Sequence, residues 1–345
     1  MPEICAAICT YARHDLLPLA LDSVRGQTLD PDRYRILIID NTGPTETGLT
    51  LQAEWDGVEN IRYRIETMPG LSRARNRAVD LSGDCAFIAY LDDDAVAPPD
   101  WLSGILDGFA SAGAKAGVVG GPVDPIWPCE RPAWLADSLL TLLTVVDWGG
   151  AWRELGEKEW IAGTNIAFRR EALVQTGGFS ERLGRTGDFV LESNEEVDVI
   201  RTLKAQGWQA FWDPALRMRH RVHGDRIDQA WIRRRISWQA VSDFKSDPAA
   251  CLARLGEREA LLTRFLERMP GTLKGVGALH ARLEDPLFFE IQVAANYAAT
   301  ILLLAGTPPA ALREDLRKAR FHGPRARLRA ALKRARRLLR APDAP

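Results

Sequence analysis

Two clusters of acidic side chains are the residues of this sequence best suited to chemistry. In the first, Leu91 is followed by three consecutive aspartates, Asp92, Asp93 and Asp94. Carboxylates this close repel one another, and a divalent cation would offset the repulsion. Mg²⁺ typically takes one or two carboxylates and completes its shell with substrate phosphates and water, so Asp92-x-Asp94 fits a site for Mg²⁺ or Mn²⁺. The alternative is a solvated acidic turn that caps the next helix, which a lone motif of this kind also fits.

The second cluster comprises residues 192–198 and precedes a helical pattern. Glu195 and Glu196 are adjacent, so repulsion and partial burial would raise the pKa of one of them towards neutral pH. Such a carboxylate suits a general base that removes a proton from an attacking hydroxyl. The alternative is that these acids, with Asp198, only favour the positive end of the helix dipole. The residues by themselves leave both interpretations open.

Strands that alternate with helices are expected to position the two clusters. Short apolar runs predict strands at residues 4–9, 34–39, 61–65, 85–91 and 117–121. Helical spacing of apolar residues predicts helices at 16–24, 71–81, 101–109 and 195–206. This alternation indicates an α/β fold with a largely parallel sheet.

Three polar clusters follow predicted strands directly, namely residues 10–13, Asp40-Asn41 and residues 92–94. Ligands of open α/β sheets bind beyond the carboxyl ends of the strands. We therefore expect one crevice to collect all three clusters.

The chain has 345 residues, of which 46% are hydrophobic, so one large α/β domain plus an extension would account for it. We expect a catalytic domain at 1–225, a helical region at 226–311 and a basic amphipathic tail at 312–345.

The five cysteines form no CxxC pair, which predicts buried thiols in a reducing compartment. The N-terminus has no signal-peptide pattern, so a cytoplasmic location is expected. The apolar stretch 288–305 includes Glu290, Gln292 and Asn296, and this favours a buried or partner-facing helix over a membrane span.

The charge of the chain is unevenly distributed. The formal net charge is −1, yet residues 313–340 contain 12 Lys and Arg against two acids. Leucines at helical spacing among these cations suit an anionic membrane surface, so a peripheral location on the inner face of the membrane is one expectation. The alternative is a solvated tail. The sequence carries no signature of a nucleic-acid-binding fold, and we expect no nucleic-acid partner.

Six ordered segments together resemble glycosyltransferase family 2. They are Ile8-Cys9-Thr10-Tyr11-Ala12-Arg13, Ile38-Ile39-Asp40-Asn41, Gly70-Leu71-Ser72-Arg73-Ala74-Arg75-Asn76, Leu91-Asp92-Asp93-Asp94, Gly163-Thr164-Asn165-Ile166-Ala167-Phe168-Arg169-Arg170 with Gly177-Gly178-Phe179, and Asn194-Glu195-Glu196-Val197-Asp198. The resemblance covers residues 4–225 and implies a GT-A fold, Rossmann-like, with a C-terminal helical extension. It implies an inverting enzyme that moves a sugar from a nucleotide-sugar to a hydroxyl of a saccharide or lipid-linked acceptor. The cofactor would be Mn²⁺ or Mg²⁺ and the nucleotide UDP by default, with GDP and dTDP open.

The resemblance also implies roles for individual residues. Glu196 would be the catalytic base, and the metal would be held by Asp94, with His220 as a second candidate ligand. The residues implied to contact the donor are Thr10, Tyr11, Arg13 and Asp40 for the nucleobase, Arg73 and Asn76 for the ribose and phosphates, Asp92 and Asp93 beside the ribose and metal, and Gly163, Thr164 and Asn165 for the sugar.

The sequence departs from the family pattern at three positions. Ala95 stands where many members have a further Asp, Glu196 is one methylene longer than the usual Asp, and Asn194 replaces a common Gly. Simpler interpretations also stand for other residues: Arg73 and Arg75 as a solvated helix face, His220 and His223 as residues outside any metal site, and the tryptophans of 127–160 as packing residues instead of sugar-stacking ones.

Two other functions remain as alternatives. A sugar-phosphate nucleotidyltransferase would carry a glycine-rich loop after the first strand, but residues 10–15 contain no glycine. A non-catalytic nucleotide-sugar-binding protein would not need both acidic clusters. A dehydrogenase is disfavoured because no GxGxxG follows a strand.

Overall fold

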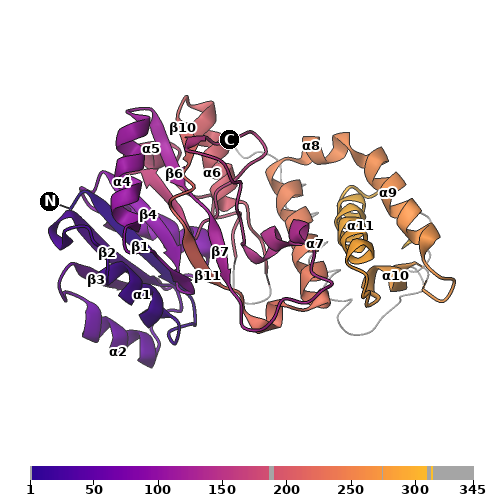
Figure 1. Ribbon diagram of the computed structural model, residues 1–345, viewed down its shortest axis with the longest axis horizontal. Helices are drawn as coiled ribbons and strands as arrows, with labels where there is room; N and C mark the ends of the chain where they lie inside the picture. Colours follow the sequence, from indigo (N-terminus) through magenta and orange to yellow (C-terminus); the bar gives the residue numbers. More distant parts are fainter. Residues whose placement is uncertain (1, 186–189, 274, 309–311, 314–345) are drawn as a thin grey trace. The chain divides into compact units, whose positions relative to one another are not determined.

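A computed structural model describes residues 2–185, 190–273, 275–308 and 312–313 (Figure 1). The chain divides into two compact units, Met1–Ser242 and Asp243–Pro345. The division falls inside helix α7 (Gln229–Ser246), whereas the sequence placed the boundary before this helix, after residue 225. Most of α7 therefore belongs to the first unit. The predicted basic tail at 312–345 lies, apart from Leu312 and Arg313, outside the described residues.

An eight-stranded sheet forms the centre of the first unit, with the strand order β3-β2-β1-β4-β9-β6-β10-β8. Its strands are β1 (Ile4–Thr10), β2 (Tyr34–Asp40), β3 (Ile61–Ile65), β4 (Phe87–Asp92), β6 (Ala116–Gly120), β8 (Arg153–Glu154), β9 (Ile166–Arg169) and β10 (Gln209–Trp212). Strands β3, β2, β1 and β4 are parallel, and β9 runs antiparallel to both β4 and β6. The predicted α/β fold with a mostly parallel sheet is confirmed.

Apolar runs without alternation become strands that are buried along their length. Every residue of β1 is buried, as expected of a parallel strand covered on both faces. The flanking helices are α1 (Leu17–Arg25), α2 (Glu46–Trp55), α3 (Leu71–Leu81), α4 (Trp101–Ala112), α5 (Arg170–Gln175) and α6 (Glu195–Ala205). The predicted ranges 61–65 and 71–81 match β3 and α3 at both ends.

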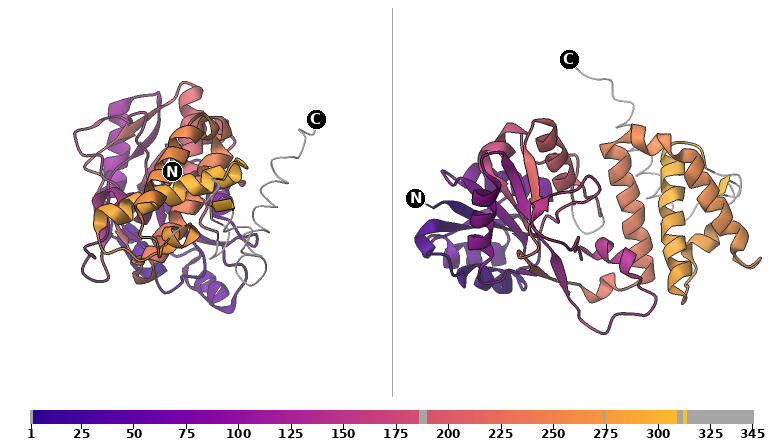
Figure 2. Two further views of the ribbon diagram at one scale, coloured as in Figure 1. Left: turned by 90° about the vertical axis from the view of Figure 1, so that its right-hand side faces the viewer. Right: turned by 45° about the horizontal axis from the view of Figure 1, so that its top comes forward.

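The order of the strands creates the place for a site. From β1 the chain moves outward to β2 and β3, then returns to β4 on the other side of β1. The crossovers reverse direction there, so helices cover both faces of the sheet (Figures 1 and 2). At such a switch point a crevice opens beyond the carboxyl ends of the strands. Thr10 ends β1 and Asp92 ends β4, so both lie at this crevice.

A small second sheet extends the site. It contains β5 (Ala95–Val96), β11 (Met218–Arg221) and β7 (Val123–Ile126) in that order. In it, His220 pairs with Ala95, immediately after the three aspartates. Three short 3₁₀ helices, η1 (Pro31–Arg33), η2 (Asp137–Leu143) and η3 (Gly224–Arg226), complete the unit.

The second unit is helical, with α8 (Pro248–Ala253), α9 (Leu255–Arg268), α10 (Val276–His280) and α11 (Pro286–Leu304). Within the described ranges, α11 is the one helix long and apolar enough to cross a membrane, and half of its apolar window is buried in the protein. Gln292 and Asn296 on this helix are buried and donate hydrogen bonds to backbone carbonyls. A packed helix, as predicted, accounts for these contacts.

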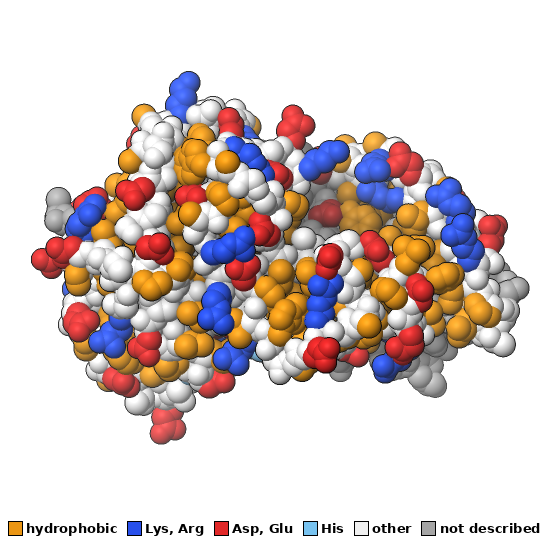
Figure 3. Space-filling view, in the orientation of Figure 1, with side chains coloured by type: hydrophobic (Ala, Val, Ile, Leu, Met, Phe, Trp, Pro, Cys, Tyr) orange, Lys and Arg blue, Asp and Glu red, His pale blue; other side chains and the backbone are white. Residues whose placement is uncertain are grey.

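Other side chains of the sequence also find packing roles. Four of the five cysteines are buried thiols, and Cys129 is exposed. Trp152 stacks on Phe211, and the indole of Trp148 donates to the carbonyl of Trp160, so both partly buried side chains make packing contacts. Acidic and basic side chains are interspersed over the face in Figure 3.

Candidate active site

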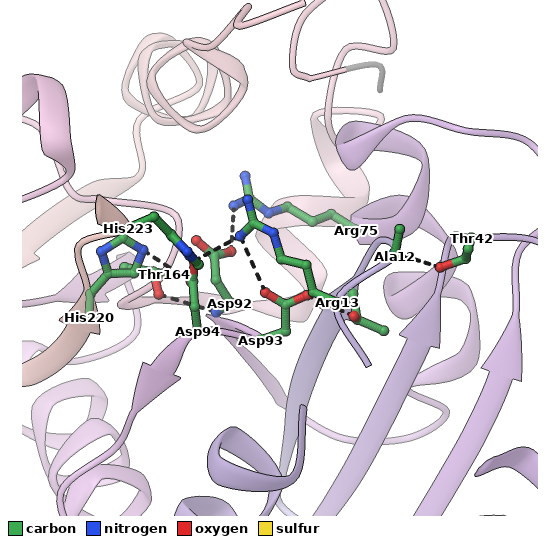
Figure 4. Close-up of polar contacts among 11 residues, drawn as sticks. Ala12, Arg13, Thr42, Arg75, Asp92, Asp93, Asp94, Thr164, His220 and His223 are labelled. Atoms are coloured by element: carbon green, nitrogen blue, oxygen red, sulfur yellow. Dashed lines mark hydrogen bonds and ion pairs between the residues drawn. The ribbon is translucent and has the colours of Figure 1, made fainter. Parts of the chain in front are cut away.

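The three aspartates lie where β4 ends, and neighbouring segments close around them (Figure 4). Thr10 donates a hydrogen bond of 2.7 Å to Asp93, and Arg13 donates one of 2.8 Å to Asp94. Asp93 and Asp94 are buried, whereas Asp92 is partly exposed. The residues after β1 and β4 therefore lie together, as the sequence predicted.

Two histidines approach Asp94 from the second sheet. Nε2 of His220 lies 3.1 Å from Oδ1 of Asp94, and Nε2 of His223 lies 2.8 Å from Oδ2. His223 and Asp94 are 129 residues apart in the sequence. Because β5 and β11 pair, these side chains meet beside the aspartates (Figure 4). Both histidines therefore lie beside the acidic cluster.

The surroundings shift the pKa values of the two buried aspartates, Asp93 and Asp94, in opposite directions. Burial, and then the neighbouring charge of Asp94, raise the pKa of Asp93 to about 7. Burial opposes ionisation of Asp94 as well, but His220, His223 and Arg13 hold its pKa well below the usual value. Asp94 is therefore the permanent anion of the pair.

The residues present fit a divalent cation. Ligand atoms of Asp92, Asp94 and His220 all lie within 4.8 Å of one another. Oδ1 of Asp94 and Nδ1 of His220 are buried without a hydrogen bond. Two carboxylates and an imidazole form a donor set that Mn²⁺ and related divalent ions accept. Asp94 and His220, both predicted as metal ligands, thus lie in one candidate site with Asp92.

A buried arginine joins this site to the second acidic cluster. Arg75, only 2% exposed, donates a hydrogen bond of 2.9 Å to Glu195. Its guanidinium also lies 3.7 Å from Asp92 and 4.0 Å from Glu196. The interpretation of Arg75 as part of a solvated helix face is wrong, because this residue lies on the buried side of α3. The ring faces of Tyr90 and Phe179 flank the guanidinium.

The guanidinium of Arg75 occupies the space that a side chain at position 163 would need, so this position favours glycine. A Cβ atom at Gly163 would lie 2.2 Å from Nη2 of Arg75. The next residue, Thr164, is buried and accepts a hydrogen bond from the backbone N–H of Asp92. Gly163 and Thr164, predicted at the donor sugar, therefore lie at the end of β4 beside Asp92.

Glu195 and Glu196 begin helix α6. The preceding residue, Asn194, has φ of 79°, a left-handed conformation that glycine and asparagine adopt most readily. This explains how Asn194 can replace the usual glycine of the resemblance. Gln239 of α7 donates to the side chain of Asn194 and so helps to fix the start of α6.

Glu196 is a buried acid with a raised pKa. Burial and the adjacent Glu195 raise its pKa to about 8, although Arg75 acts in the opposite direction. One of its carboxylate oxygens is buried without a hydrogen bond. Glu195, by contrast, is paired with Arg75. The two adjacent acids therefore differ: Glu195 is the ion-pair partner of Arg75, and Glu196 is the acid with the raised pKa.

Asp40, predicted to contact the nucleobase, is enclosed. It is 0% exposed, its Oδ1 accepts from the N–H of Thr42, and its Oδ2 accepts from the hydroxyl of Tyr63. The side chain of His14 covers the same oxygen, with Nε2 at 2.8 Å. The sequence reasoning missed His14, although it directly follows Arg13 in the first motif. Both carboxylate oxygens of Asp40 are therefore in contact with protein groups.

Four other predicted donor residues differ in their placement. Tyr11 is 38% exposed and so free to contact a ligand. Arg73 pairs with Glu181 and lines a shallow surface hollow together with Asn76. The amide of Asn76 bonds both the N–H and the carbonyl of Phe179. The buried side chain of Asn165 accepts a hydrogen bond from Trp101 and donates to the backbone carbonyls of Pro122 and Leu216.

Comparison with solved structures defines the class of fold. The mannosyltransferase PcManGT from Pyrobaculum calidifontis, solved with GDP-Man and Mn²⁺, matches 96% of this chain and 79% of its own at 20% identity and a TM-score of 0.51. GalNAc-T7, solved with UDP, GalNAc and Mn²⁺, matches 70% of this chain and 50% of its own at 14% identity and a TM-score of 0.50. The fold is that of the GT-A glycosyltransferases.

The sequence comparisons then identify the family. Residues 5–175 match the model "Glycosyl transferase family 2", so the chain contains a domain of this family of glycosyltransferases. The glucosyl-dolichyl phosphate glucuronosyltransferase of Haloferax volcanii is 26% identical over 294 residues, which cover 84% of this chain and 90% of the relative. The succinoglycan biosynthesis protein ExoM of Rhizobium meliloti is 27% identical over 231 residues, 66% of this chain and 70% of the relative.

Proposed function

We propose that this glycosyltransferase inverts the anomeric centre of a nucleotide-sugar, with Glu196 as the general base. The observation that carries the proposal is the pairing of two acidic centres through Arg75. One centre, Asp92 with Asp94 and His220, fits a divalent cation, and the other contains a buried carboxylate whose pKa is about 8.

Each centre has a separate task in the proposed reaction. Glu196 takes the proton of the acceptor hydroxyl as the oxygen attacks the anomeric carbon from the face opposite the nucleotide. Arg75 holds Glu195 as its ion-pair partner, so that Glu196 stays the acid free to accept a proton. Asp92, Asp94 and His220 would hold Mn²⁺ or Mg²⁺, which would neutralise the charge of the departing diphosphate. No protein nucleophile is required, because one displacement inverts the centre.

The donor is proposed to lie along the ends of β1, β2 and β4. Thr10, Tyr11, Arg13 and His14 form the loop that joins the aspartate centre to Asp40. We place the nucleoside towards His14 and the diphosphate towards Arg13. UDP is the default nucleotide, with GDP and dTDP as alternatives.

A lipid-linked saccharide is the proposed acceptor, and the Haloferax relative supports this, since its name specifies a glucosyl-dolichyl phosphate. An acceptor of this kind is consistent with a cytoplasmic enzyme at the inner face of a membrane. The Arg-rich segment 313–340 is proposed to bind anionic lipid there.

The test is turnover with a panel of UDP-, GDP- and dTDP-sugars and lipid-linked acceptors, in Mn²⁺ and in EDTA. We expect metal-dependent transfer from one donor and a product whose anomeric configuration, read by NMR, is opposite to that of the donor. Retention of configuration would overturn the inverting mechanism. Donor binding without transfer to any acceptor would favour a non-catalytic nucleotide-sugar-binding protein.

A further inference from the structure

Side chains of helix α7 hold the two residues that precede helix α6. The hydroxyl of Ser242 accepts a hydrogen bond of 3.0 Å from the backbone N–H of Ser193. The amide of Gln239 accepts one of 3.0 Å from the hydroxyl of Ser193 and donates one of 2.8 Å to the side chain of Asn194. Arg235 donates to the same serine hydroxyl at 3.3 Å. Two adjacent residues are therefore fixed by side chains that follow them by 42 to 49 positions in the sequence.

These contacts act on a residue whose backbone conformation needs support. Asn194 is the N-cap residue of α6, and its φ of 79° lies in the left-handed region, which is unfavourable for residues that carry a Cβ atom. An N-cap asparagine usually accepts a hydrogen bond from a backbone N–H of its own helix. Within the described ranges, the side chain of Asn194 makes no such cap and instead accepts from Gln239. The turn at the start of α6 thus depends on α7.

This turn sets the direction of the two acids that follow it. Glu195 and Glu196 are the first residues of α6, so a rotation of the backbone at Asn194 would move both carboxylates relative to Arg75. The hydrogen bond from Arg75 to Glu195 is 2.9 Å long, and the guanidinium lies 4.0 Å from Glu196. Catalytic geometry is sensitive to displacements of about 1 Å, which are large relative to these distances.

The side chain of Ser242 is suited to be a fixed anchor. It is 0% exposed, and its hydroxyl donates to the carbonyl of Trp238 while it accepts from Ser193. Both partners of the hydroxyl are backbone groups, so its direction is determined. Positions 235, 239 and 242 share one face of α7 because they are separated by four and then three residues. That face is the one in contact with the start of α6.

We propose that Gln239 and Ser242 are positioning residues for the carboxylate of Glu196. The inference rests on the proposed function, in which Glu196 is the general base. It extends the working parts of the site to α7, which lies beyond residues 5–175, the part of the chain that matches the family model.

The test follows the carboxyl group of Glu196 itself. The full-length protein is labelled with ¹³C at the side-chain carboxyl of glutamate, and the NMR signal missing from Glu196→Gln assigns Glu196. Gln239→Leu keeps much of the volume without the amide, and Ser242→Ala removes only the hydroxyl. Gln27→Leu is the matched control, because the buried amide of Gln27 also joins separate segments by hydrogen bonds to backbone groups.

The pKa of Glu196 is the first readout. In the wild type we expect it to be about 8, because burial and then Glu195 raise it against the effect of Arg75. Loss of either contact with α7 lets the carboxylate move away from Glu195 and into water. The pKa of Glu196 is therefore expected to fall towards 4.5 in Gln239→Leu and in Ser242→Ala. Gln27→Leu is expected to lower the urea midpoint and to leave this pKa unchanged.

Turnover with the panel of UDP-, GDP- and dTDP-sugars is the second readout. At about pH 9, where most of the base is deprotonated, we expect kcat to fall by about ten-fold in Gln239→Leu and in Ser242→Ala. The KM for the donor is expected to stay within about two-fold of the wild type, because these residues act on the base and not on donor binding.

A double substitution tests the contact with Asn194 directly. Asn194→Gly allows the left-handed backbone and removes the acceptor of the hydrogen bond from Gln239. Because that bond is already absent in Asn194→Gly, adding Gln239→Leu is expected to shift the pKa of Glu196 less than Gln239→Leu does alone.

A pKa of Glu196 and a kcat equal to those of the wild type in both Gln239→Leu and Ser242→Ala would overturn the inference. An equal shift of this pKa in Gln27→Leu would overturn it as well, since the effect would then follow from any loss of packing. A shifted pKa in the two α7 variants, together with full turnover by Glu196→Gln, would refute the proposed base and leave the positioning of the carboxylate by α7 standing.

Discussion

Replacement of Glu196 by Gln is expected to lower activity and raise stability together. Glu196 is buried beside Glu195, and its pKa is raised from 4.5 to about 8. Glutamine keeps the shape of the side chain but accepts no proton, so we expect kcat to fall by about 10²- to 10⁴-fold. In the wild type, kcat is expected to rise with pH through about 8, because the base must be deprotonated.

The sign of the stability effect follows from the direction of the pKa shift. A folded-state pKa above the unfolded value means that the folded protein holds the proton more tightly. The corresponding stability is present below the unfolded pKa and is lost as pH rises through the folded pKa. Since each pKa unit corresponds to about 1.4 kcal/mol, the loss is on the order of a few kcal/mol between about pH 5 and pH 9. Glu196→Gln removes this loss, so the variant is expected to be more stable than the wild type at the alkaline end.

Urea unfolding followed by tryptophan fluorescence measures this effect in the relevant unit. All 11 tryptophans lie within Met1–Ser242, so the signal reports the first unit alone. Glu54→Gln, an exposed carboxylate on α2, is the control and should change neither activity nor the pH dependence of stability. Full turnover by Glu196→Gln, or a variant less stable than the wild type at about pH 9, would refute the assignment of a buried base.

Three further predictions concern the rest of the site. Asp94→Asn is expected to abolish the Mn²⁺-dependent rise in melting temperature with a nucleotide-sugar, and a rise equal to that of the wild type would exclude Asp94 as a ligand. Gly163→Ala places a Cβ atom 2.2 Å from Arg75, so we expect the free energy of unfolding to fall by about 1–3 kcal/mol. An unchanged urea midpoint would show that Arg75 has room to move. His14→Ala uncovers Asp40 and is expected to alter the ratio of UDP to GDP affinities in calorimetry, whereas equal changes for both would place the base elsewhere.

Local patterns in the sequence were sufficient for the framework of the first unit. Both ends of β3 and of α3 were predicted correctly, from the apolar run 61–65 and the helical spacing of apolar residues in 71–81. Such predictions succeed because the buried face of a strand or helix leaves a periodic pattern of apolar residues in the sequence. The prediction that three polar clusters meet followed from the rule for carboxyl ends of parallel strands. The contacts of Thr10 with Asp93 and Asn41 and of Arg13 with Asp94 bear it out. The boundary after residue 225 differed from the division inside α7, because helical periodicity does not show which core a helix packs on.

The tertiary structure decided the partners of the charged residues. The sequence by itself determined that two acidic clusters follow a strand and begin a helix, because strand and helix formation depend on neighbours along the chain. It did not determine that Arg75 is buried between them, since on α3 this arginine looks like any solvent-facing cation. Only the family resemblance linked His220 with Asp94, and nothing in the sequence brought His223 there, because this requires the pairing of β5 with β11 across more than a hundred residues. Long-range pairing leaves no local pattern in one sequence, and the ion pairs of this site arise only when the two sheets form.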